Sequence, residues 1–331
     1  MIAGKEQTIK VKQEDDGQRL DRWLKKYVPE LPYVLAQKLI RKGAVKIDGT
    51  KARMDSRIAA GQDIRIPAFE MRGAAGGEKP PYRISADDEK MIRAMVLYDD
   101  GDVIALNKPA GLATQGGGDE KRHIDGMLPV LAGKDGTVPR LVHRLDKETS
   151  GVLLLARSAE AVRRLVKSFK ERNIRKIYWA VTLGVPAQRE GTIRAPVGKV
   201  KGPIKDKMTI DEIDGKGAVT DFVVIDRMQS ALAFVAFWPR TGRTHQIRVH
   251  AAEILECPVL GDRRYGGQSD EFDALDLAPR LYLHARRVIL PHPLDETKML
   301  DITAPLDVDL AGSWETLGFD SRLKDDPFET L

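Results

Sequence analysis

Apolar side chains in the first seventy residues follow first a helical and then a strand-like spacing. Apolar residues at the i, i+3, i+4 and i+7 positions predict one helix: Leu20, Trp23, Leu24 and Tyr27. A second helical stretch, 34–42, ends before Gly43, the residue type favoured in left-handed helix caps. Alternating runs at 44–47 and 64–66 predict strands, and an Asp-Gly tight-turn pair follows the first run. This part of the chain therefore predicts a small helix–helix–sheet module over 1–70.

The pattern changes after position 70. Residues 71–82 (MRGAAGGEKPPY) contain little that could enter a core, so we predict a linker over 71–90. Beyond it, the periodicity predicts a helix at 158–171 and strands at 103–106, 151–156, 177–181, 218–225 and 231–238. We expect an α+β domain with a mixed, mainly antiparallel sheet over 91–318. The acidic, Pro-containing tail at 319–331 is expected to be poorly ordered.

Composition is that of a water-soluble globular protein. Hydrophobic residues make up 42% and charged residues 31%, and no apolar run is long enough for a membrane span. The N-terminus is polar and lacks the apolar core of a secretory signal, and a single cysteine, Cys257, excludes an internal disulfide. We therefore expect a cytoplasmic protein that does not act at a membrane.

Basic residues concentrate in two zones. Residues 1–70 contain 15 Lys/Arg against 10 Asp/Glu, and 157–207 contain 14 against 4. The second helix and the following hairpin carry a predicted basic edge: Lys38, Arg41, Lys42, Lys46 and Arg53. In the second zone, Lys201 and Lys205 lie in a Gly-containing loop. Either zone could be only a solvated surface, but local basic faces of this kind attract polyanions.

Reactive side chains are densest at 141–151 (LVHRLDKETSG), just before a predicted buried strand. Loops held by a rigid sheet often carry catalytic groups, although Asp146 taken alone could equally form a salt bridge or a cap. A triad of Ser150, His143 and Asp146 is weakly supported, because neighbours in one loop do not supply triad geometry. A metal site of His245 and His250 is weak too, because they lie five positions apart instead of the four that place two ligands on one face of a helix.

Several segments resemble, in order, the motifs of the RluA-type pseudouridine synthases. The HRLD and TSG segments at 143–146 and 149–151 resemble the family signature. Further segments resemble other motifs of the family: 106–112 (LNKPAGL), 176–180 (KIYWA), 241–250 (TGRTHQIRVH) and 283–293. Residues 17–67 resemble the alpha-L RNA-binding domain. The order of parts is closest to enzymes of the RluC and RluD types, with the RluC type favoured.

This resemblance implies an enzyme that isomerises uridines in 23S ribosomal RNA, as a monomer and without a metal or other cofactor. Asp146 would be the catalytic carboxylate, Tyr178 would stack on the target base, and Arg248 would pair with Asp146. Arg144, with His143 beside it, would contact RNA around a flipped uridine. The two basic zones would contact the RNA backbone. Whether the carboxylate attacks C1′, assists loss of the C2′ hydrogen or adds to C6 stays open.

Two functions from other classes remain as alternatives. The first is a noncatalytic RNA-binding factor in ribosome assembly that keeps the architecture. The second is a hydrolase that uses Ser150 as its nucleophile, which would need no N-terminal RNA-binding module.

Overall fold

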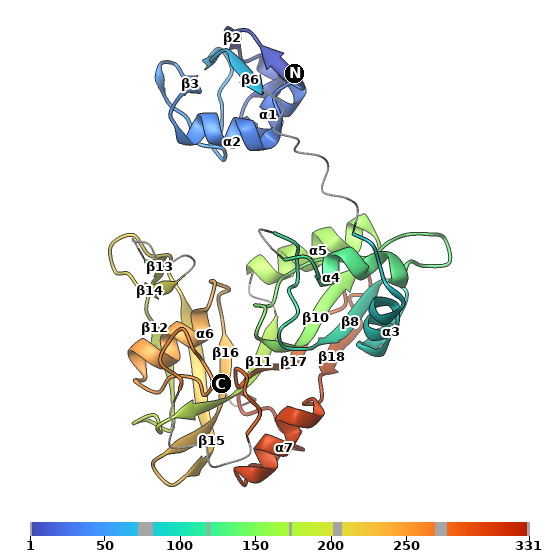
Figure 1. The fold of residues 1–331 in the computed structure, drawn as a ribbon, viewed down its shortest axis with the longest axis vertical. Helices are drawn as coiled ribbons and strands as arrows, with labels where there is room; N and C mark the ends of the chain where they lie inside the picture. The colour runs from blue at the N-terminus through green and yellow to red at the C-terminus, as the bar shows by residue number, and fades with distance from the viewer. Residues whose placement is uncertain are drawn as a thin grey trace. The chain divides into compact units, whose positions relative to one another are not determined.

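The computed structural model in Figure 1 divides into two compact units, Met1–Pro81 and Tyr82–Leu331. The structure describes residues 2–71, 82–117, 120–171, 174–200, 207–268 and 277–329. Within these ranges, no helix is long and apolar enough to cross a membrane.

The N-terminal unit packs α-helices against a small sheet. Its described elements are β1 (Ile2–Gly4), β2 (Gln7–Lys10), the 3-10 turn η1 (Gln13–Asp15), α1 (Leu20–Tyr27), α2 (Tyr33–Arg41), β3 (Lys46–Ile47), β4 (Thr50–Lys51), β5 (Asp63–Ile66) and β6 (Phe69–Met71). The sheet order is β2-β5-β3-β4, and β1 pairs with β6. The predicted helices and strands are confirmed, and Asp48 and Gly49 both take positive φ in the predicted turn. The pattern does not predict β2, because its sequence QTIK contains a single strongly apolar residue.

The larger unit is built around one mixed sheet. Its described elements are α3 (Ala86–Ala94), β7 (Val96–Asp99), β8 (Val103–Lys108), α4 (Ile124–Met127), η2 (Leu128–Leu131), β9 (Arg140–Leu141), β10 (Ser150–Ala156), α5 (Ala159–Glu171), β11 (Arg175–Leu183), β12 (Glu190–Arg194), β13 (Val197–Lys199), β14 (Met208–Ile210), β15 (Val219–Met228), β16 (Leu232–Pro239), α6 (Gln246–Val249), the π-helical turn η3 (His250–Ile254), β17 (Leu283–Pro291), β18 (Met299–Thr303) and α7 (Val308–Thr316). Its α+β character agrees with the prediction.

The strand order of this sheet brings distant parts of the chain together. Neighbouring strands follow the order β12-β15-β16-β11-β17-β10-β8-β7, with β18 beside β17 and β9 beside β10. Among the described strands, β10 and β17 run parallel and the other neighbours are antiparallel. Figure 1 shows α3 and α5 near β8 and β10 and α6 near β16, with β11 and β17 between the two ends of the sheet. The loop before β10 and the segment after β16 therefore meet over the middle of the sheet.

Two predicted boundaries differ from the structure. The predicted linker over 71–90 is too long, because the larger unit begins at Tyr82 and Ser85 caps α3 through a reciprocal capping box with Asp88. Most of the remaining linker, 72–81, lies outside the described residues. The tail is not loose, because Phe319 and Phe328 are buried in the core of the sheet. The acidic composition of the tail did not indicate that these two phenylalanines are buried.

Candidate active site

A pocket of about 790 Å³ opens on the larger unit. Its walls come from the loop before β10, the C-terminal half of α5, β11 and the segment between β16 and α6. Residues predicted from three separate motifs line it: His143, Arg144, Asp146, Tyr178 and Arg248. The fold thus brings the predicted site residues of the larger unit together, apart from those that lie outside the described ranges.

The loop that carries Asp146 is held from below by buried polar contacts. Leu145 donates its backbone N–H to the Thr114 hydroxyl oxygen at 3.2 Å, and that hydroxyl donates to the Leu145 carbonyl at 2.7 Å. The buried Lys108 ammonium donates to the carbonyl of Lys147 at 3.1 Å and to two carbonyls of its own segment. Burial lowers the pKa of Lys108 to about 7. These contacts hold the loop of Asp146 in place. Lys108 therefore supports the loop, and it does not line the pocket.

The carboxylate of Asp146 faces His245 at the pocket wall. Its side chain is 32% exposed, and its Oδ2 atom lies 3.9 Å from Nε2 of His245. The distance is too long for a hydrogen bond.

Arg248 does not form the predicted ion pair with Asp146. Its guanidinium instead makes two hydrogen bonds to Asp262, at 2.6 and 2.7 Å. Burial opposes the charge of Arg248, but Asp262 and then Asp146 favour it, and the net effect raises the pKa of Arg248. Arg248 therefore acts on Asp146 through the electrostatic field of the pocket, and Asp262 is the direct partner because it lies fully buried beside it.

Tyr178 faces the pocket from a β-bulge. The register of β11 against β17 shifts between Ile177 and Tyr178, a distortion that often redirects a side chain beside an active site. Burial, and then the charge of Asp146, raises the pKa of the Tyr178 phenol. The phenol therefore keeps its proton at neutral pH and offers a flat ring and an O–H donor to a bound base.

His143 makes packing contacts at the wall of the pocket, and its contact with RNA stays a prediction. Its Nε2 accepts a hydrogen bond from the backbone N–H of Leu154 at 2.9 Å, and its ring stacks on Phe169 at 4.4 Å. Burial lowers the pKa of His143 to about 3, so the ring is neutral and does not present a positive charge to phosphate.

Positive side chains occur around the rim of the pocket. Arg144, Lys170 and Arg243 are exposed there. Arg144 forms no ion pair with any residue in the described ranges, so its guanidinium is available for a ligand. Lys201 and Lys205, which were also predicted to contact RNA, lie outside the described residues.

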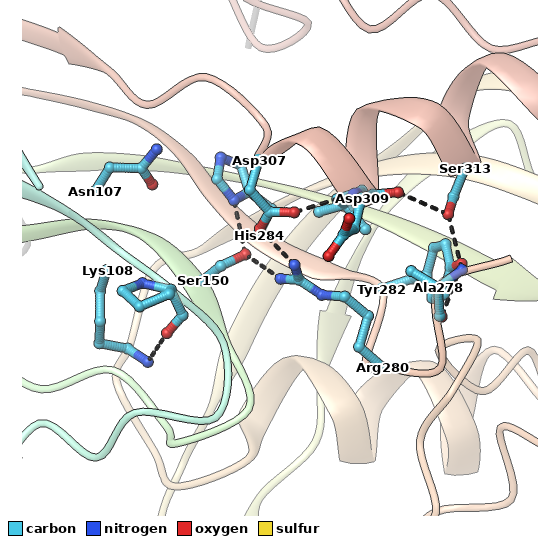
Figure 2. Close-up of polar contacts among 12 residues, drawn as sticks. Asn107, Lys108, Ser150, Ala278, Arg280, Tyr282, His284, Asp307, Asp309 and Ser313 are labelled. Atoms are coloured by element: carbon cyan, nitrogen blue, oxygen red, sulfur yellow. Dashed lines mark hydrogen bonds and ion pairs between the residues drawn. The ribbon is translucent and has the colours of Figure 1, made fainter. Parts of the chain in front are cut away.

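Ser150 is not placed as a nucleophile. It is 0% exposed, and Figure 2 shows it between His284 and Arg280. The His284 Nε2 donates to the Ala304 carbonyl at 3.1 Å, so Nδ1 accepts from the Ser150 hydroxyl at 2.9 Å. Arg280 donates to the same hydroxyl oxygen and pairs with Asp307. This buried network disfavours the hydrolase alternative and the triad with His143.

Three contributors to the site were not anticipated from the sequence pattern. Gln246 links the pocket segment to β15, because its amide accepts from Thr241 and donates to the Val219 carbonyl. Asp262 and Tyr265 support Arg248 and His245 from the segment after η3. Gln246 lies inside a motif that the sequence shows, whereas the segment GDRRYGG around the other two carries no pattern that indicates a partner.

The N-terminal unit carries the predicted basic edge. Lys46 of this edge is half-buried. The other four residues are exposed: Lys38, Arg41, Lys42 and Arg53. In the sheet, Lys46 lies opposite Lys51 of β4 and Arg65 of β5. Positive side chains from α2 and from three strands therefore occur on one small unit.

Comparisons with known proteins agree with this arrangement. The family model described as RNA pseudouridylate synthase matches residues 102–253, which include the pocket residues of the three central motifs. The chain is 35% identical over 277 residues to ribosomal large subunit pseudouridine synthase C of Rickettsia prowazekii (strain Madrid E), covering 82% of this chain and 88% of that protein. It is 31% identical over 306 residues to the protein of the same name from Vibrio vulnificus (strain CMCP6), covering 92% and 94%.

A solved structure supports the same assignment. The human protein titled RNA Pseudouridylate Synthase Domain Containing 4 superposes with a TM-score of 0.60 and 29% identity, over 70% of this chain and 97% of that chain. Sequence identity above 30% over most of both chains, together with the shared fold and the pocket, shows that this chain belongs to the RluA-type RNA pseudouridine synthases.

Proposed function

We propose that this enzyme isomerises uridines of 23S ribosomal RNA to pseudouridine, with Asp146 as the catalytic carboxylate. The observation that carries the proposal is the presentation of Asp146, on a loop held by buried hydrogen bonds, into a pocket shared with Tyr178. The similarity to proteins named ribosomal large subunit pseudouridine synthase C supports the RluC-type substrate class over a noncatalytic assembly factor. We expect the protein to act in the cytoplasm as a monomer.

The reaction requires one bond to break and another to form without loss of either fragment. The C1′–N1 bond of uridine breaks, the uracil turns, and a C1′–C5 bond forms, while C5 loses a proton and N1 gains one. A carboxylate can attack C1′, assist loss of the C2′ hydrogen or add to C6. Asp146 can serve each route, because one of its oxygens faces His245 and the other has no hydrogen-bond partner among the described residues.

Tyr178 is suited to hold the uracil through this rotation. Its protonated phenol cannot act as a base at neutral pH, because burial and Asp146 both raise its pKa. The ring can stack on the base, and the O–H can donate to a uracil oxygen.

A uridine in a stem must leave the base stack before it can enter the pocket, which costs a few kcal/mol. Arg144, which is exposed on the pocket rim, would stack in the vacated space or hold the adjacent phosphate. Lys170 and Arg243 extend the positive rim and would contact the RNA backbone. The basic edge of the N-terminal unit would supply a second, sequence-independent contact.

The nucleophile assignment is tested with Asp146→Asn and Asp146→Ala. We expect both variants to bind RNA but to lose tritium release from 5-tritiated uridine RNA by on the order of 10³-fold or more, as with other lost nucleophiles. Asp125→Asn, an exposed change on α4 outside the pocket, is the control and should retain wild-type release. Undiminished release from the Asp146 variants would contradict the assignment.

The substrate class is tested separately. Pseudouridines in 23S ribosomal RNA should be mapped in a strain that lacks the gene and in the same strain carrying the wild-type or the Asp146→Asn copy. The missing positions should return with the wild-type copy alone. An unchanged map would argue for another RNA substrate and leave the chemistry standing.

A further inference from the structure

His245 occupies an unusual position in the wall of the pocket. It immediately precedes α6 with φ 55° and ψ 20°, a left-handed conformation that few residues other than glycine adopt. Backbone of this kind persists where surrounding contacts hold it, and such positions cluster at functional sites. The ring that this backbone positions lies between Asp146 on one side and Tyr265 on the other.

The hydrogen bonds of Tyr265 indicate which nitrogen of His245 carries the proton. The buried Tyr265 oxygen already accepts a hydrogen bond from the backbone N–H of Met208 at 3.0 Å. Its own hydrogen has Nδ1 of His245 as an acceptor at 2.8 Å, and the two rings meet edge to face at 5.6 Å. With Nδ1 acting as acceptor, a neutral imidazole carries its hydrogen on Nε2. Nε2 is the atom that faces Asp146.

The surrounding charges are consistent with a neutral ring. Burial lowers the pKa of His245 and outweighs the opposing effect of Asp146, while Arg248 and Arg264 lower it further. Tyr265 is itself fixed, because its backbone N–H donates to Asp262, the same carboxylate that holds Arg248. Asp262 therefore supports both Arg248, directly, and His245, through Tyr265.

We propose that His245 is a positioning residue for Asp146, with its tautomer set by Tyr265, so that its Nε2–H holds Oδ2 and leaves Oδ1 free to react. The proposal rests on the role of Asp146 in the proposed function. The distance of 3.9 Å between Nε2 of His245 and Oδ2 of Asp146 must shorten by somewhat under 1 Å to make a hydrogen bond. The proposal therefore requires this distance to shorten when RNA is bound.

A hydrogen bond from His245 would restrict the rotation of the Asp146 carboxylate. The terminal torsion of an aspartate is broad, so an unheld carboxylate samples orientations that do not face the reacting carbon. A neutral donor restricts the rotation, whereas a cation at the same place would neutralise the oxygen more strongly. Loss of this restraint should slow the chemical step and leave RNA binding nearly unchanged.

The test compares His245→Asn, Tyr265→Phe and the double variant under single-turnover and steady-state conditions. Asn adopts the left-handed backbone readily, so the fold should be kept, and thermal unfolding checks this. We expect His245→Asn to lower kcat by about 10- to 100-fold with KM within about twofold of wild type. Tyr265→Phe should lower kcat by about three- to tenfold, the effect of one lost hydrogen bond.

The double variant distinguishes positioning from simple damage to the fold. Because Tyr265 acts through His245, the double variant should be no slower than His245→Asn, whereas independent structural effects would multiply. Tyr282→Phe, which removes another buried hydroxyl of the same unit, is the matched control and should keep wild-type kcat.

Three results would overturn the proposal: wild-type kcat in His245→Asn, losses confined to KM, or multiplicative losses in the double variant. If His245→Asn does not fold, Tyr265→Phe still tests the proposal, because kcat equal to that of Tyr282→Phe would refute it. Activity in Asp146→Asn would refute the nucleophile instead. An inactive Asp146→Asn beside a fully active His245→Asn would refute this inference alone.

Discussion

Arg248, at the wall of the pocket, and Asp262 form a buried pair of opposite charges. Asp262 is 0% exposed at its side chain, and its Oδ1 also accepts the backbone N–H groups of Arg264 and Tyr265. Burying two charges costs several kcal/mol, which the mutual attraction and these additional hydrogen bonds offset. Removing one partner would leave the other charge buried without compensation.

We therefore predict that Asp262→Asn lowers the free energy of unfolding by about 3–5 kcal/mol, measured by urea denaturation. The double variant Asp262→Leu with Arg248→Met should lose less than Asp262→Asn, because it leaves no unpaired charge. A loss under about 1 kcal/mol in Asp262→Asn would show that water or another group takes over the pairing.

His284 makes the stability of the larger unit sensitive to acid. Burial lowers the pKa of His284 to about 4 from an ordinary value of 6.5. The unfolded chain therefore binds a proton at a higher pH than the folded chain does. The free energy of unfolding should fall as the pH drops from about 6.5 to about 4, by up to about 1.4 kcal/mol per pH unit from this residue.

The contribution is isolated by comparing wild type with His284→Gln in urea titrations at several pH values. The variant will be less stable at pH 7, because Ser150 loses its acceptor, but its stability should depend less steeply on pH. Equal slopes would contradict the assignment of the acid sensitivity to this residue.

At the level of elements, the contact between β10 and β17 requires a glycine. Gly151 lies opposite Ala285 in this parallel pair and has a φ of +108°. A Cβ atom at this position would lie 2.2 Å from the Ala285 carbonyl oxygen. The glycine that ends the TSG segment is thus explained by a close approach of two backbones directly beside the loop of Asp146.

We predict that Gly151→Ala lowers the free energy of unfolding by at least about 2 kcal/mol, because the methyl group would force these strands apart in a strained conformation. Gly312→Ala in α7 is the control: it meets open space, and it should be neutral or stabilising by about 0.5–1 kcal/mol. Equal stability of the two variants, read from urea midpoints, would contradict this account.

The elements that the pattern predicts are those whose own side chains determine their burial. β10 is a continuous apolar run, and the stripe of α5 packs on the sheet, so both appear in the sequence. The helix α3 is harder to predict, because its sequence ADDEKMIRA is mostly charged and buries Ile92 and the capping Asp88. The bulge at Tyr178 has no local signal, because it arises from the pairing of β11 with β17.

At the scale of the whole molecule, the chain contains two units with separate cores. The core of the N-terminal unit includes Leu20, Trp23 and Ile64, and the basic edge lies on its surface. We propose that this module adds a second contact on a large RNA without altering the chemistry. Two linked contacts raise affinity through effective concentration, provided that one RNA can engage both.

Deletion of residues 1–81 should therefore reduce kcat/KM on 23S ribosomal RNA by on the order of 10- to 100-fold and leave activity on a short stem-loop within about twofold. The triple variant Lys38→Gln, Arg41→Gln, Lys42→Gln should produce a smaller loss and a weaker dependence of binding on salt. Tritium release on both substrates measures the effect. Equal losses on the two RNAs would argue that the module supports folding rather than docking.

By itself, the sequence determined the α+β class, the N-terminal module and five of the residues that line the pocket: His143, Arg144, Asp146, Tyr178 and Arg248. These follow from periodicity, turn residues and contiguous motifs, which depend only on residues that are close together in the sequence. The tertiary structure alone decided the pairings. Arg248 contacts Asp262 instead of Asp146, His143 stacks on Phe169, and His245 faces the carboxylate. These contacts depend on which groups lie nearest to one another after folding. The spacing of residues along the chain does not predict those distances.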